Sequence, residues 1–560
     1  MTRTTAGPPR RPADRRIRLL LILFGVGFAA VLARAAWLQG VRAPALGELA
    51  AVQQRADVTK PAGRGTIFDR RGVALALGRQ GMTVYADPSR VREPEKVADA
   101  AGAALGVDSD ALLRALSDSS RRFVYIARQA DPDQAAALGR QELPGVGFYP
   151  EELRVYPQGA VASHVLGYAG IDNRGLAGIE KQLDPILSGR PGKATVVTDP
   201  SGRLIDVVAG SDARQGQDVF LTIDHVLQAR TEGVLAQLVR QWRARSATAV
   251  VLDARSGGVL AMANAPVFDA NNFGVTPADW SRNRAVTDTF EPGSTFKIVT
   301  VAGALAERLV GPRTAFTLAP SIWVADREIH EAERDYTVRL SVTDIVARSS
   351  NVGSITLAQL LGPKRLAGWI RRFGFGRPTG IEFPGETRGI VRPLREWSGS
   401  TIGNVPIGQG IAVTPVQMAA AFGALANRGM WVQPHLVRRV GDEEPAAARK
   451  RRIVPRSVAT HMLRMLRGVV REGSGTRAAV PGYQVAGKTG TAEKPDEHGY
   501  GTGRYVGSFV GIVPASAPRL VILVLVDEPE GQYYGGTVAA PAFSELARFA
   551  LQYLEIPPDA

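Results

Sequence analysis

The sequence contains no cysteine among its 560 residues. This absence excludes disulfides, thiolate metal sites and a cysteine nucleophile, but it does not fix the compartment in which the protein works. Histidine is also scarce: there are six, and no two have the spacing of a metal-binding pair. We therefore expect no metal site, and we interpret the histidines as surface or structural residues.

Lysine is rare as well: the chain has nine, so arginine supplies most of its 68 basic residues. The net charge of +15 could favour nucleic acid, an acidic membrane surface or an acidic polymer. No basic run alternates with aromatic residues, so we expect no nucleic-acid partner. Hydrophobic residues make up 45% of the chain and charged residues 22%, which is ordinary for a globular protein of two to four domains.

The N-terminus combines a basic tail with a long apolar run. Six arginines stand within residues 1–18 against one acid, Asp14. Residues 19–38 are apolar apart from Arg34, and twenty helical residues span roughly 30 Å, one hydrocarbon core. Because positive charge stays on the cytoplasmic side, we predict a cytoplasmic tail (1–18), a single-pass anchor in the cell membrane (19–38) and an extracytoplasmic remainder. A cleaved signal peptide ending near Ala33-Arg-Ala35 is the alternative.

Two regions follow the anchor. Residues 42–210 are irregular and rich in Gly and Pro, with alternating stretches and short helical patterns. Residues 216–556 contain strands and helices in mixed order. The sequence predicts an α/β (α+β) fold for this second region, with an antiparallel sheet and a helical insertion over about 290–480. The predicted strands are 82–86, 219–223, 247–252, 258–263, 484–492, 505–513 and 520–526, and the predicted helices are 97–105, 111–116, 225–243 (capped by Asp224) and 542–554.

The first candidate for chemistry is Ser294 with Lys297. Pro292 and Gly293 break the chain before an apolar run, so we expect Ser294 at the start of a helix, where its backbone N–H can face a developing oxyanion. Lys297 lies three residues later on the same helix face and can act as the base that a serine nucleophile needs. A lysine does this only as a neutral amine, which burial or a neighbouring cation favours. Arginine stays protonated, so a lysine retained here in an arginine-rich chain is informative.

Two later motifs complete the set. Ser349-Ser-Asn351 offers a hydroxyl and an amide from one turn, although Ser281-Arg-Asn283 has the same form. Lys488-Thr-Gly-Thr491 lies on a predicted strand, where Gly490 lets a ligand backbone approach the strand closely. The hydroxyls of Thr489 and Thr491 then share one face, and Lys488 adds a cation that binds a carboxylate or favours a neutral Lys297. A solvated edge strand with one lysine is the plain alternative.

In this order, S-x-x-K, S-x-N and K-T-G resemble the catalytic motifs of penicillin-binding proteins and class A β-lactamases. With the anchor, the chain is most similar to a class B penicillin-binding protein, a monofunctional D,D-transpeptidase. The resemblance implies a mostly β pedestal or dimerisation domain (42–210) and a serine transpeptidase/β-lactamase-like domain (216–556). Further stretches that carry it are 64–72, 175–180, 187–189, 406–410 and 414–418.

The resemblance also implies the roles of the motif residues. Ser294 attacks a stem peptide ending in D-Ala-D-Ala, Lys297 is the base, and Ser349 is the proton shuttle. Asn351 contacts the substrate, Lys488 and Thr489 hold its terminal carboxylate, and the N–H groups of Ser294 and Thr491 form the oxyanion hole. β-Lactam antibiotics acylate Ser294 by mimicking the donor. No cofactor and no metal is required.

Within the family, the chain is most similar to the division-specific FtsI type. That type works in septal cell-wall synthesis beside a polytopic SEDS-type glycosyltransferase and other divisome proteins. The elongation-specific type is the near alternative. A β-lactamase and a non-catalytic penicillin-binding sensor or scaffold are further alternatives, although the long N-terminal region and the intact motifs argue against them.

Overall fold

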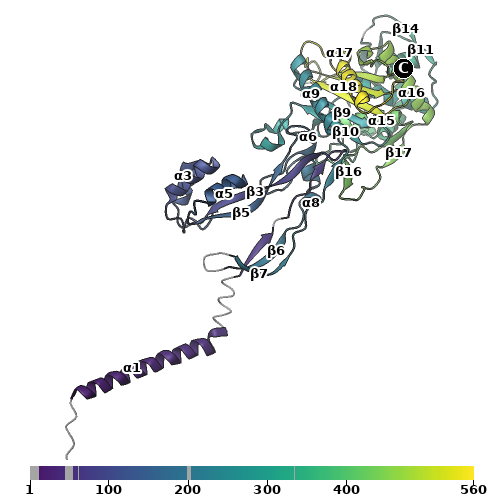
Figure 1. The fold of residues 1–560 in the computed structure, drawn as a ribbon. Coiled ribbons are helices and arrows are strands. Elements are labelled where there is room, and N and C mark those ends of the chain that lie inside the picture. Colours follow the sequence, from purple (N-terminus) through teal and green to yellow (C-terminus); the bar gives the residue numbers. More distant parts are fainter. Residues whose placement is uncertain are drawn as a thin grey trace, which may run out of the picture. The chain divides into compact units, whose positions relative to one another are not determined.

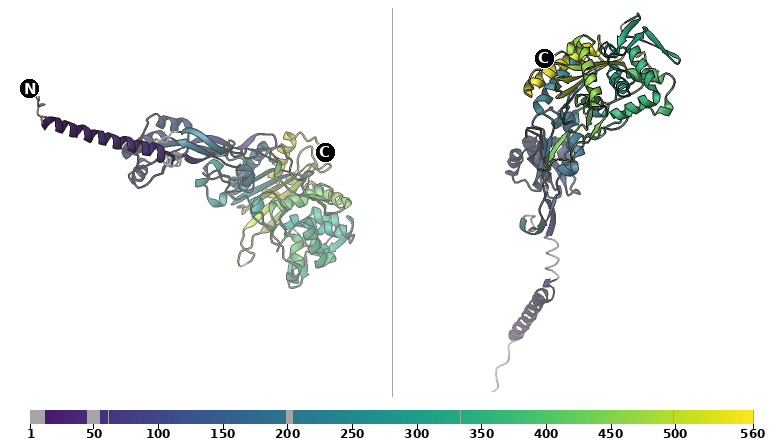
Figure 2. Two further views of the ribbon diagram at one scale, coloured as in Figure 1. Left: turned by 90° about the horizontal axis from the view of Figure 1, so that it is seen from below. Right: turned by 90° about the vertical axis from the view of Figure 1, so that its right-hand side faces the viewer.

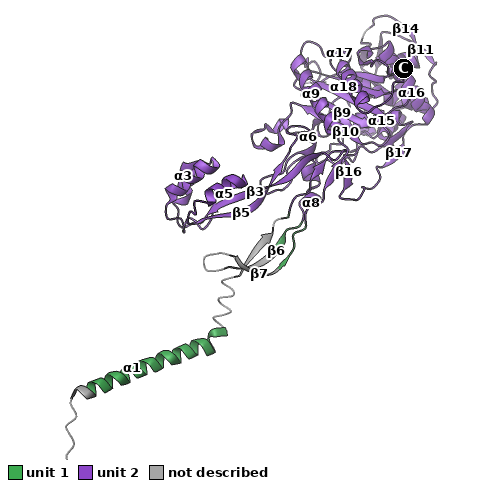
Figure 3. Ribbon diagram, viewed as in Figure 1, with its two compact units in different colours: residues 1–62, 190–214 green, residues 63–189, 215–560 purple. Residues whose placement is uncertain are grey.

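The computed structural model describes residues 12–44, 55–60, 62–198, 204–332, 334–497 and 499–559. Two compact units are distinguished: residues 1–62 with 190–214, and residues 63–189 with 215–560 (Figure 3). These two units do not coincide with the predicted domains 42–210 and 216–556. The bounds of those domains stay a prediction.

The first unit contains the apolar helix and a small sheet. Helix α1 (Pro12–Ala36) continues into a π-helical turn, η1 (Trp37–Val41). Its segment Arg15–Val41 is long and apolar enough to cross a membrane, and it is the one helix of that kind in the described ranges. Residues 1–11 of the predicted basic tail lie outside the described residues. Strands β1 (Arg55–Lys60), β6 (Gly192–Thr198) and β7 (Leu204–Ser211) form an antiparallel sheet in the order β1-β6-β7.

The second unit starts with a six-stranded sheet in the order β16-β8-β2-β3-β4, with β5 on the other edge of β3. Predicted helices 97–105 and 111–116 are found with slightly longer bounds, and predicted strand 82–86 is the end of a longer strand. Pro94 at the first turn and left-handed Gly106 at the end delimit the first of these helices. The elements are β2 (Ile67–Phe68), β3 (Ala74–Ala86), α3 (Pro94–Leu105), α4 (Ser109–Leu116), β4 (Val124–Ala130), α5 (Pro132–Gly139), β5 (Val146–Val155), α6 (Ser163–Leu166), α7 (Gly178–Gln182), α8 (Asp184–Leu187), β8 (Val219–Leu221) and β16 (Val437–Val440).

A buried ion network ties together two stretches that carry the family resemblance. Arg64 donates to Glu180 at 2.7 Å and to Asp184 at 2.7 Å, and Arg154 donates to the other oxygen of Glu180 at 2.6 Å. Arg64 and Glu180 are fully buried, so each charge depends on its partner. The network joins residues 64–72 to residues 175–180.

A five-stranded antiparallel sheet, in the order β10-β9-β20-β19-β18, organises the C-terminal part (Figure 1). All five strands were predicted, with bounds that differ by up to two residues. They are β9 (Ser246–Asp253), β10 (Val259–Ala265), β18 (Ala486–Glu493), β19 (Tyr505–Val513) and β20 (Leu520–Asp527). The near-continuous apolar sequences of β9, β10 and β20 are consistent with burial of both faces, whereas β18 carries the polar residues Lys488, Thr489 and Thr491.

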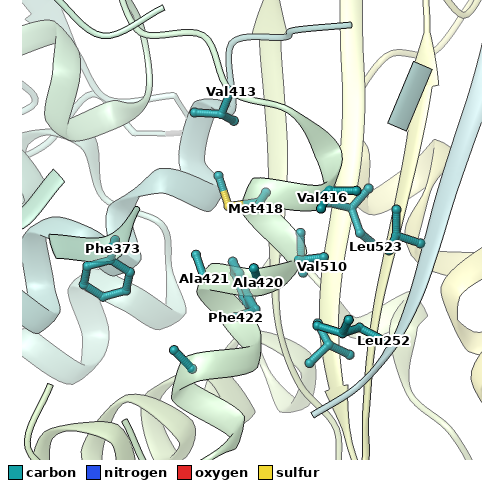
Figure 4. Close-up of a cluster of buried hydrophobic side chains, with 14 of the residues drawn as sticks. Leu252, Phe373, Val413, Val416, Met418, Ala420, Ala421, Phe422, Val510 and Leu523 are labelled. Carbon is teal, nitrogen blue, oxygen red and sulfur yellow. The ribbon is translucent and has the colours of Figure 1, made fainter. Parts of the chain in front are cut away.

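Helices cover both faces of this sheet. Helix α9 (His225–Trp242), capped by the Asp224 side chain as predicted, and helix α18 (Ala540–Tyr553) pack on one face. Helix α15 (Pro415–Ala426) packs on the other and inserts Met418 and Phe422 between sheet and helices (Figure 4). Both side chains are fully buried, and each such burial stabilises the fold by about 1.5–3 kcal/mol.

The segment between β10 and β18 is mainly helical, as predicted, and its helices gather in one lobe (teal to green in Figure 2). Three short two-stranded sheets within it were not predicted. Helix α13 is broken at Gly362, before Pro363. The elements are α10 (Arg284–Thr287), η4 (Gly293–Phe296), α11 (Lys297–Ala306), β11 (Ala315–Leu318), β12 (Ser321–Val324), β13 (Arg327–His330), β14 (Val338–Ser341), α12 (Val342–Ala347), α13 (Asn351–Phe373), α14 (Thr401–Asn404), α15, β15 (Met430–Val432), β17 (Lys450–Arg452) and α16 (Arg456–Arg471).

Candidate active site

Ser294 lies in a tight turn rather than at the first position of an α-helix. The 3₁₀ turn η4 spans Gly293–Phe296, and α11 begins only at Lys297. The predicted helix start at Ser294 is confirmed, because this 3₁₀ turn runs directly into α11 and the whole helix spans Gly293–Ala306. Gly293 takes a positive φ of +52° and donates its N–H to the Gly408 carbonyl at 3.1 Å, which fixes where the turn begins. Ser294 itself is half-buried.

Lys297 is buried and directed at the second motif. Its side chain is 2% exposed, and its amine contacts the Ser349 carbonyl, the Ser349 hydroxyl at 3.2 Å and Asn351 Oδ1 at 2.8 Å. The structure thus brings two of the three predicted motifs together around one amine. The Lys297 amine is therefore surrounded by oxygen atoms of the second motif and has almost no contact with solvent.

The second motif occupies a strained junction between two helices. Ser349 has a φ of +58°, in the left-handed region that costs a non-glycine residue about 1–2 kcal/mol. It stands between the end of α12 and Ser350, whose hydroxyl caps α13 by accepting from the Gly353 N–H at 3.0 Å. In this conformation Ser349 presents both its carbonyl and its hydroxyl to Lys297.

Glu331, which sequence reasoning missed, holds the second motif in place. Its carboxylate accepts from the Asn351 N–H at 2.9 Å, the Val352 N–H at 3.2 Å and the Ser350 hydroxyl at 2.5 Å. It also pairs with Arg334 at 2.9 Å, and its side chain is 5% exposed. The carboxylate therefore supplies the negative charge that the N-terminus of α13 favours. A lone Glu in a loop gives no sequence signal for this role.

The other serine-asparagine pair has a structural role. The Ser281 hydroxyl donates to the Ala278 carbonyl at 3.0 Å. Asn283 is buried and donates to the His164 carbonyl at 3.1 Å, while its Oδ1 accepts from Asn264 at 3.1 Å. Of the two motifs, the one with Ser349 and Asn351 contacts Lys297.

The third motif lies on β18, the strand at the edge of the five-stranded sheet. Lys488 is nevertheless fully buried, so the alternative of a solvated lysine is wrong. Its amine donates to the Ser349 hydroxyl at 2.9 Å and contacts the carbonyl of Thr489 at 3.3 Å. The Ser349 hydroxyl thus lies between two amines, Lys297 and Lys488.

Gly490 lies close against two other parts of the chain. A Cβ at this position would stand 2.8 Å from the Pro292 carbonyl oxygen, 2.9 Å from a methyl carbon of Thr295 and 2.4 Å from the Ser508 hydroxyl. The close neighbours within the chain are therefore the Ser508 side chain and the turn that carries Ser294. On the other side of this contact, a Cβ on Gly293 would stand 2.6 Å from the Thr491 carbonyl oxygen. Two glycines let the turn and the strand touch, so Ser294 and Thr491 are neighbours.

The hydroxyls of Thr489 and Thr491 have partners within the chain. Thr489 Oγ1 shares a hydrogen bond of 2.7 Å with the Ser474 hydroxyl, and Thr491 Oγ1 accepts from the Gly535 N–H at 3.1 Å. Ser474 was not predicted, because it lies in a loop with no motif. A ligand at this strand would meet hydroxyls that are already oriented.

A cavity of about 480 Å³ adjoins the end of β18. Its lining includes Glu291 on one side and Ala492 and Glu493 on the other. Burial raises the pKa of the Glu291 carboxyl, although that group accepts from the Tyr500 hydroxyl and the Gly410 N–H. The volume suits a peptide-sized ligand, although none of the predicted site residues is part of the lining. Within the described ranges, no three His, Asp or Glu side chains cluster as metal ligands.

Two family models match the chain. The model described as the penicillin-binding protein dimerisation domain matches residues 59–221. The model described as the penicillin binding protein transpeptidase domain matches residues 247–548, which contain all three motifs.

Individual relatives agree with these matches. The chain is 33% identical to the peptidoglycan D,D-transpeptidase FtsI of Escherichia coli, with 97% of this chain and 93% of that protein covered. It is also 33% identical to stage V sporulation protein D of Bacillus subtilis, with 97% and 86% covered. Among solved structures, it resembles penicillin binding protein 3 of Mycobacterium tuberculosis complexed with aztreonam, at 30% identity and a TM-score of 0.72, with 90% of this chain and 98% of that chain covered.

Proposed function

The chain belongs to the class B penicillin-binding proteins, and we propose that it is a peptidoglycan D,D-transpeptidase that works through an acyl-enzyme on Ser294. The observation that carries the serine mechanism is the Ser349 hydroxyl, which contacts the buried amines of Lys297 and Lys488 beside the Ser294 turn. A set of three motifs that converge on one proton path has no evident purely structural use.

Lys297 is the base in this proposal. A neutral amine has two N–H groups and one lone pair. The Ser349 carbonyl and Asn351 Oδ1 can only accept, so they occupy the two N–H groups and leave the lone pair for a hydroxyl proton. Both amines contact Ser349 Oγ, so they lie within about 6 Å of each other, where one positive charge disfavours a second. Lys488 as a cation thus keeps Lys297 neutral.

The acylation step follows from these positions. Lys297 takes the proton of Ser294, the Ser294 oxygen bonds to the penultimate carbonyl of the donor stem peptide, and the bond to the terminal D-Ala nitrogen breaks. The proton reaches the leaving amine through Ser349. The amine of a second stem peptide then attacks the ester, so Ser294 recovers its proton and the cross-link forms.

The remaining motif residues bind the donor. The backbone N–H groups of Ser294 and Thr491, neighbours across the turn–strand contact, would hold the developing oxyanion. Lys488 and Thr489 would hold the terminal carboxylate, and Gly490 shapes the strand beside it. Asn351 would contact the donor through its amide nitrogen, which donates to the His330 carbonyl at 3.1 Å and has a second hydrogen for a ligand. The same groups would take up a β-lactam as a mimic of the donor.

The proposed setting is the cell membrane. The apolar helix supports a single-pass anchor with residues 1–18 in the cytoplasm and the pedestal (42–210) and transpeptidase (216–556) domains outside. Similarity to FtsI of Escherichia coli over nearly the whole chain supports a role in septal synthesis. In that role the chain would work beside a polytopic SEDS-type glycosyltransferase and other divisome proteins. An elongation role is the second candidate.

Labelled penicillin tests the serine mechanism. We expect a long-lived adduct that maps to Ser294, that Ser294→Ala abolishes and that Ser281→Ala, the matched serine of the other motif, leaves unchanged. Lys297→Arg replaces the neutral amine by a permanently protonated group and so removes the base, which should slow acylation by at least about 100-fold. Rapid turnover of the adduct would indicate a β-lactamase, and absence of labelling would leave only a scaffold.

Depletion in the source bacterium separates the two cellular roles. A septal enzyme should give filaments, because growth continues without division. Rounded cells would contradict the septal assignment and favour elongation.

A further inference from the structure

A second polar cavity lies away from the three motifs, at the far end of the helix that starts with Asn351. Its volume is about 320 Å³. Basic side chains from three segments line it, and we call it the basic pocket. These residues are Arg371, Arg377, Arg449, Lys450 and Arg451. They come from the last turn of α13, the loop that follows, and the strand β17 with the residue before it.

No acidic residue lines the basic pocket. In the part of the chain that the structure describes, none of its five basic side chains is in a salt bridge. The cavity beside Glu291 is different: its Arg282 and Arg284 each pair with Asp288, at 2.6 and 3.1 Å. The basic pocket therefore concentrates more unpaired positive charge than the cavity beside Glu291 does. A concave surface lined by one sign of charge focuses a field that attracts the opposite charge.

The surroundings of Arg451 show that the basic side chains of the pocket lie close to one another. Its guanidinium lies 4.7 Å from the centre of the Trp431 ring and donates to the Arg372 carbonyl at the end of α13. Burial, with Arg377 and Arg372 nearby, lowers the pKa of Arg451. Repulsion of this kind destabilises the empty pocket, and a bound anion would relieve it.

The pocket is also held in shape. The Arg377 carbonyl accepts from Gln417 of α15 at 2.8 Å, and Arg449 Nε donates to Gln433 at 2.9 Å. The side chains of Arg377 and Lys450 are exposed and make no hydrogen bond that the structure records, so they are free to turn toward a ligand. A fixed frame with mobile cations at its rim suits a small, highly charged ligand.

We propose that the basic pocket binds a ligand that carries two or more linked phosphate groups. Five cations around about 320 Å³ suit a ligand that carries several negative charges in a small volume. Guanidinium groups match phosphate oxygens in pairs, and each phosphate concentrates its charge on one tetrahedral centre. An acidic peptide places at most one charge per residue, at roughly 3.3–3.6 Å per residue of extended chain, so a cavity of this size admits few of them.

Two sources supply this chemistry: a free di- or polyphosphate, and a diphosphate linked to a lipid. The wall of the pocket includes buried Phe373 and Trp431 and the exposed Pro378, which would contact a hydrocarbon chain near the phosphates. The chemistry of the phosphates is the same in both cases, and the attached chain distinguishes them.

Calorimetric titration of the full-length protein in detergent with inorganic diphosphate tests the proposal. We expect saturable 1:1 binding that weakens as salt is raised. The double variant Arg377→Ala/Lys450→Ala should weaken it by at least about tenfold, because two charge-assisted partners are lost. Arg464→Ala/Arg467→Ala removes the same net charge from the exposed face of α16 and should change the affinity by less than about twofold.

Three outcomes would overturn the proposal: no saturable binding by the parent protein, equal weakening in both double variants, or tighter binding of hexaglutamate than of diphosphate. Farnesyl diphosphate then assigns the source. Binding at least tenfold tighter than that of inorganic diphosphate indicates a lipid-linked ligand, and equal binding indicates a free phosphate. Both double variants should react normally with labelled penicillin, which shows that they are folded.

Discussion

The contact between Gly490 and the turn that carries Ser294 makes a quantitative prediction for Gly490→Ala. The added Cβ would lie 2.8 Å from the Pro292 carbonyl oxygen, whereas ordinary van der Waals contact begins near 3.4 Å. Because Pro292 is backbone of the turn, the turn must retreat from β18 by about 0.6 Å. A shift of this size moves Ser294 relative to Thr491, and a misplacement of about 1 Å can cost 100-fold in rate. We expect acylation to slow by roughly 10- to 100-fold.

Stopped-flow acylation with a fluorescent penicillin measures this effect, and Gly487→Ala is the matched control. Gly487 lies on the same strand as Gly490 but away from the turn. A Cβ on Gly487 would stand 2.4 Å from the Phe509 ring. Both variants should lose about 1–3 kcal/mol of stability through overpacking. Only Gly490→Ala should lose acylation rate. A folded Gly490→Ala protein that acylates at the parental rate would refute the role of this contact.

Three other changes probe charges outside the strand. Glu331→Gln weakens the hydrogen bond from the Asn351 N–H to this side chain, so the free energy of unfolding should fall by about 1–3 kcal/mol. Acylation should also become slower, and an unchanged acylation rate would contradict the positioning role. Burial raises the pKa of Glu232 to about 7, so stability should fall by about 3 kcal/mol as pH rises from about 4.5 to 7, and Glu232→Gln should abolish this slope in denaturant titrations. Arg64→Met leaves buried Glu180 short of a partner and should cost about 3–5 kcal/mol; a loss below 1 kcal/mol would mean that Arg154 alone suffices.

The sheet could be predicted from the sequence because its signal is local. Residues 505–513 form β19 with the predicted bounds, and 247–252 and 520–526 fall within β9 and β20. Apolar runs bounded by Gly, Pro and Asp determine such strands without reference to partners. The short pairs such as β12 with β13 escaped prediction, since their strands have only four residues and β13 is mostly polar and exposed.

The site was predictable in its residue types but not in its geometry. Order along the chain identified Ser294, Lys297 and Lys488, yet the burial of Lys488 and the role of Gly490 depend on contacts between distant segments. Glu331 gave no signal at all, because an isolated acidic residue in a loop is usually a solvated one. Its function exists only once the loop lies against the start of α13.

The break in α13 at Gly362 and Pro363 means that the two ends of this helix are not parts of one rigid rod. An unbroken helix of 23 residues would be a rod of about 35 Å that passes an axial push from one end to the other. A residue at φ +74° and ψ +159° interrupts the hydrogen-bond ladder, so the two pieces can tilt at this joint. Strain introduced near Phe373 is then absorbed before it reaches Asn351, and the surface at one end can vary while the catalytic end keeps its alignment.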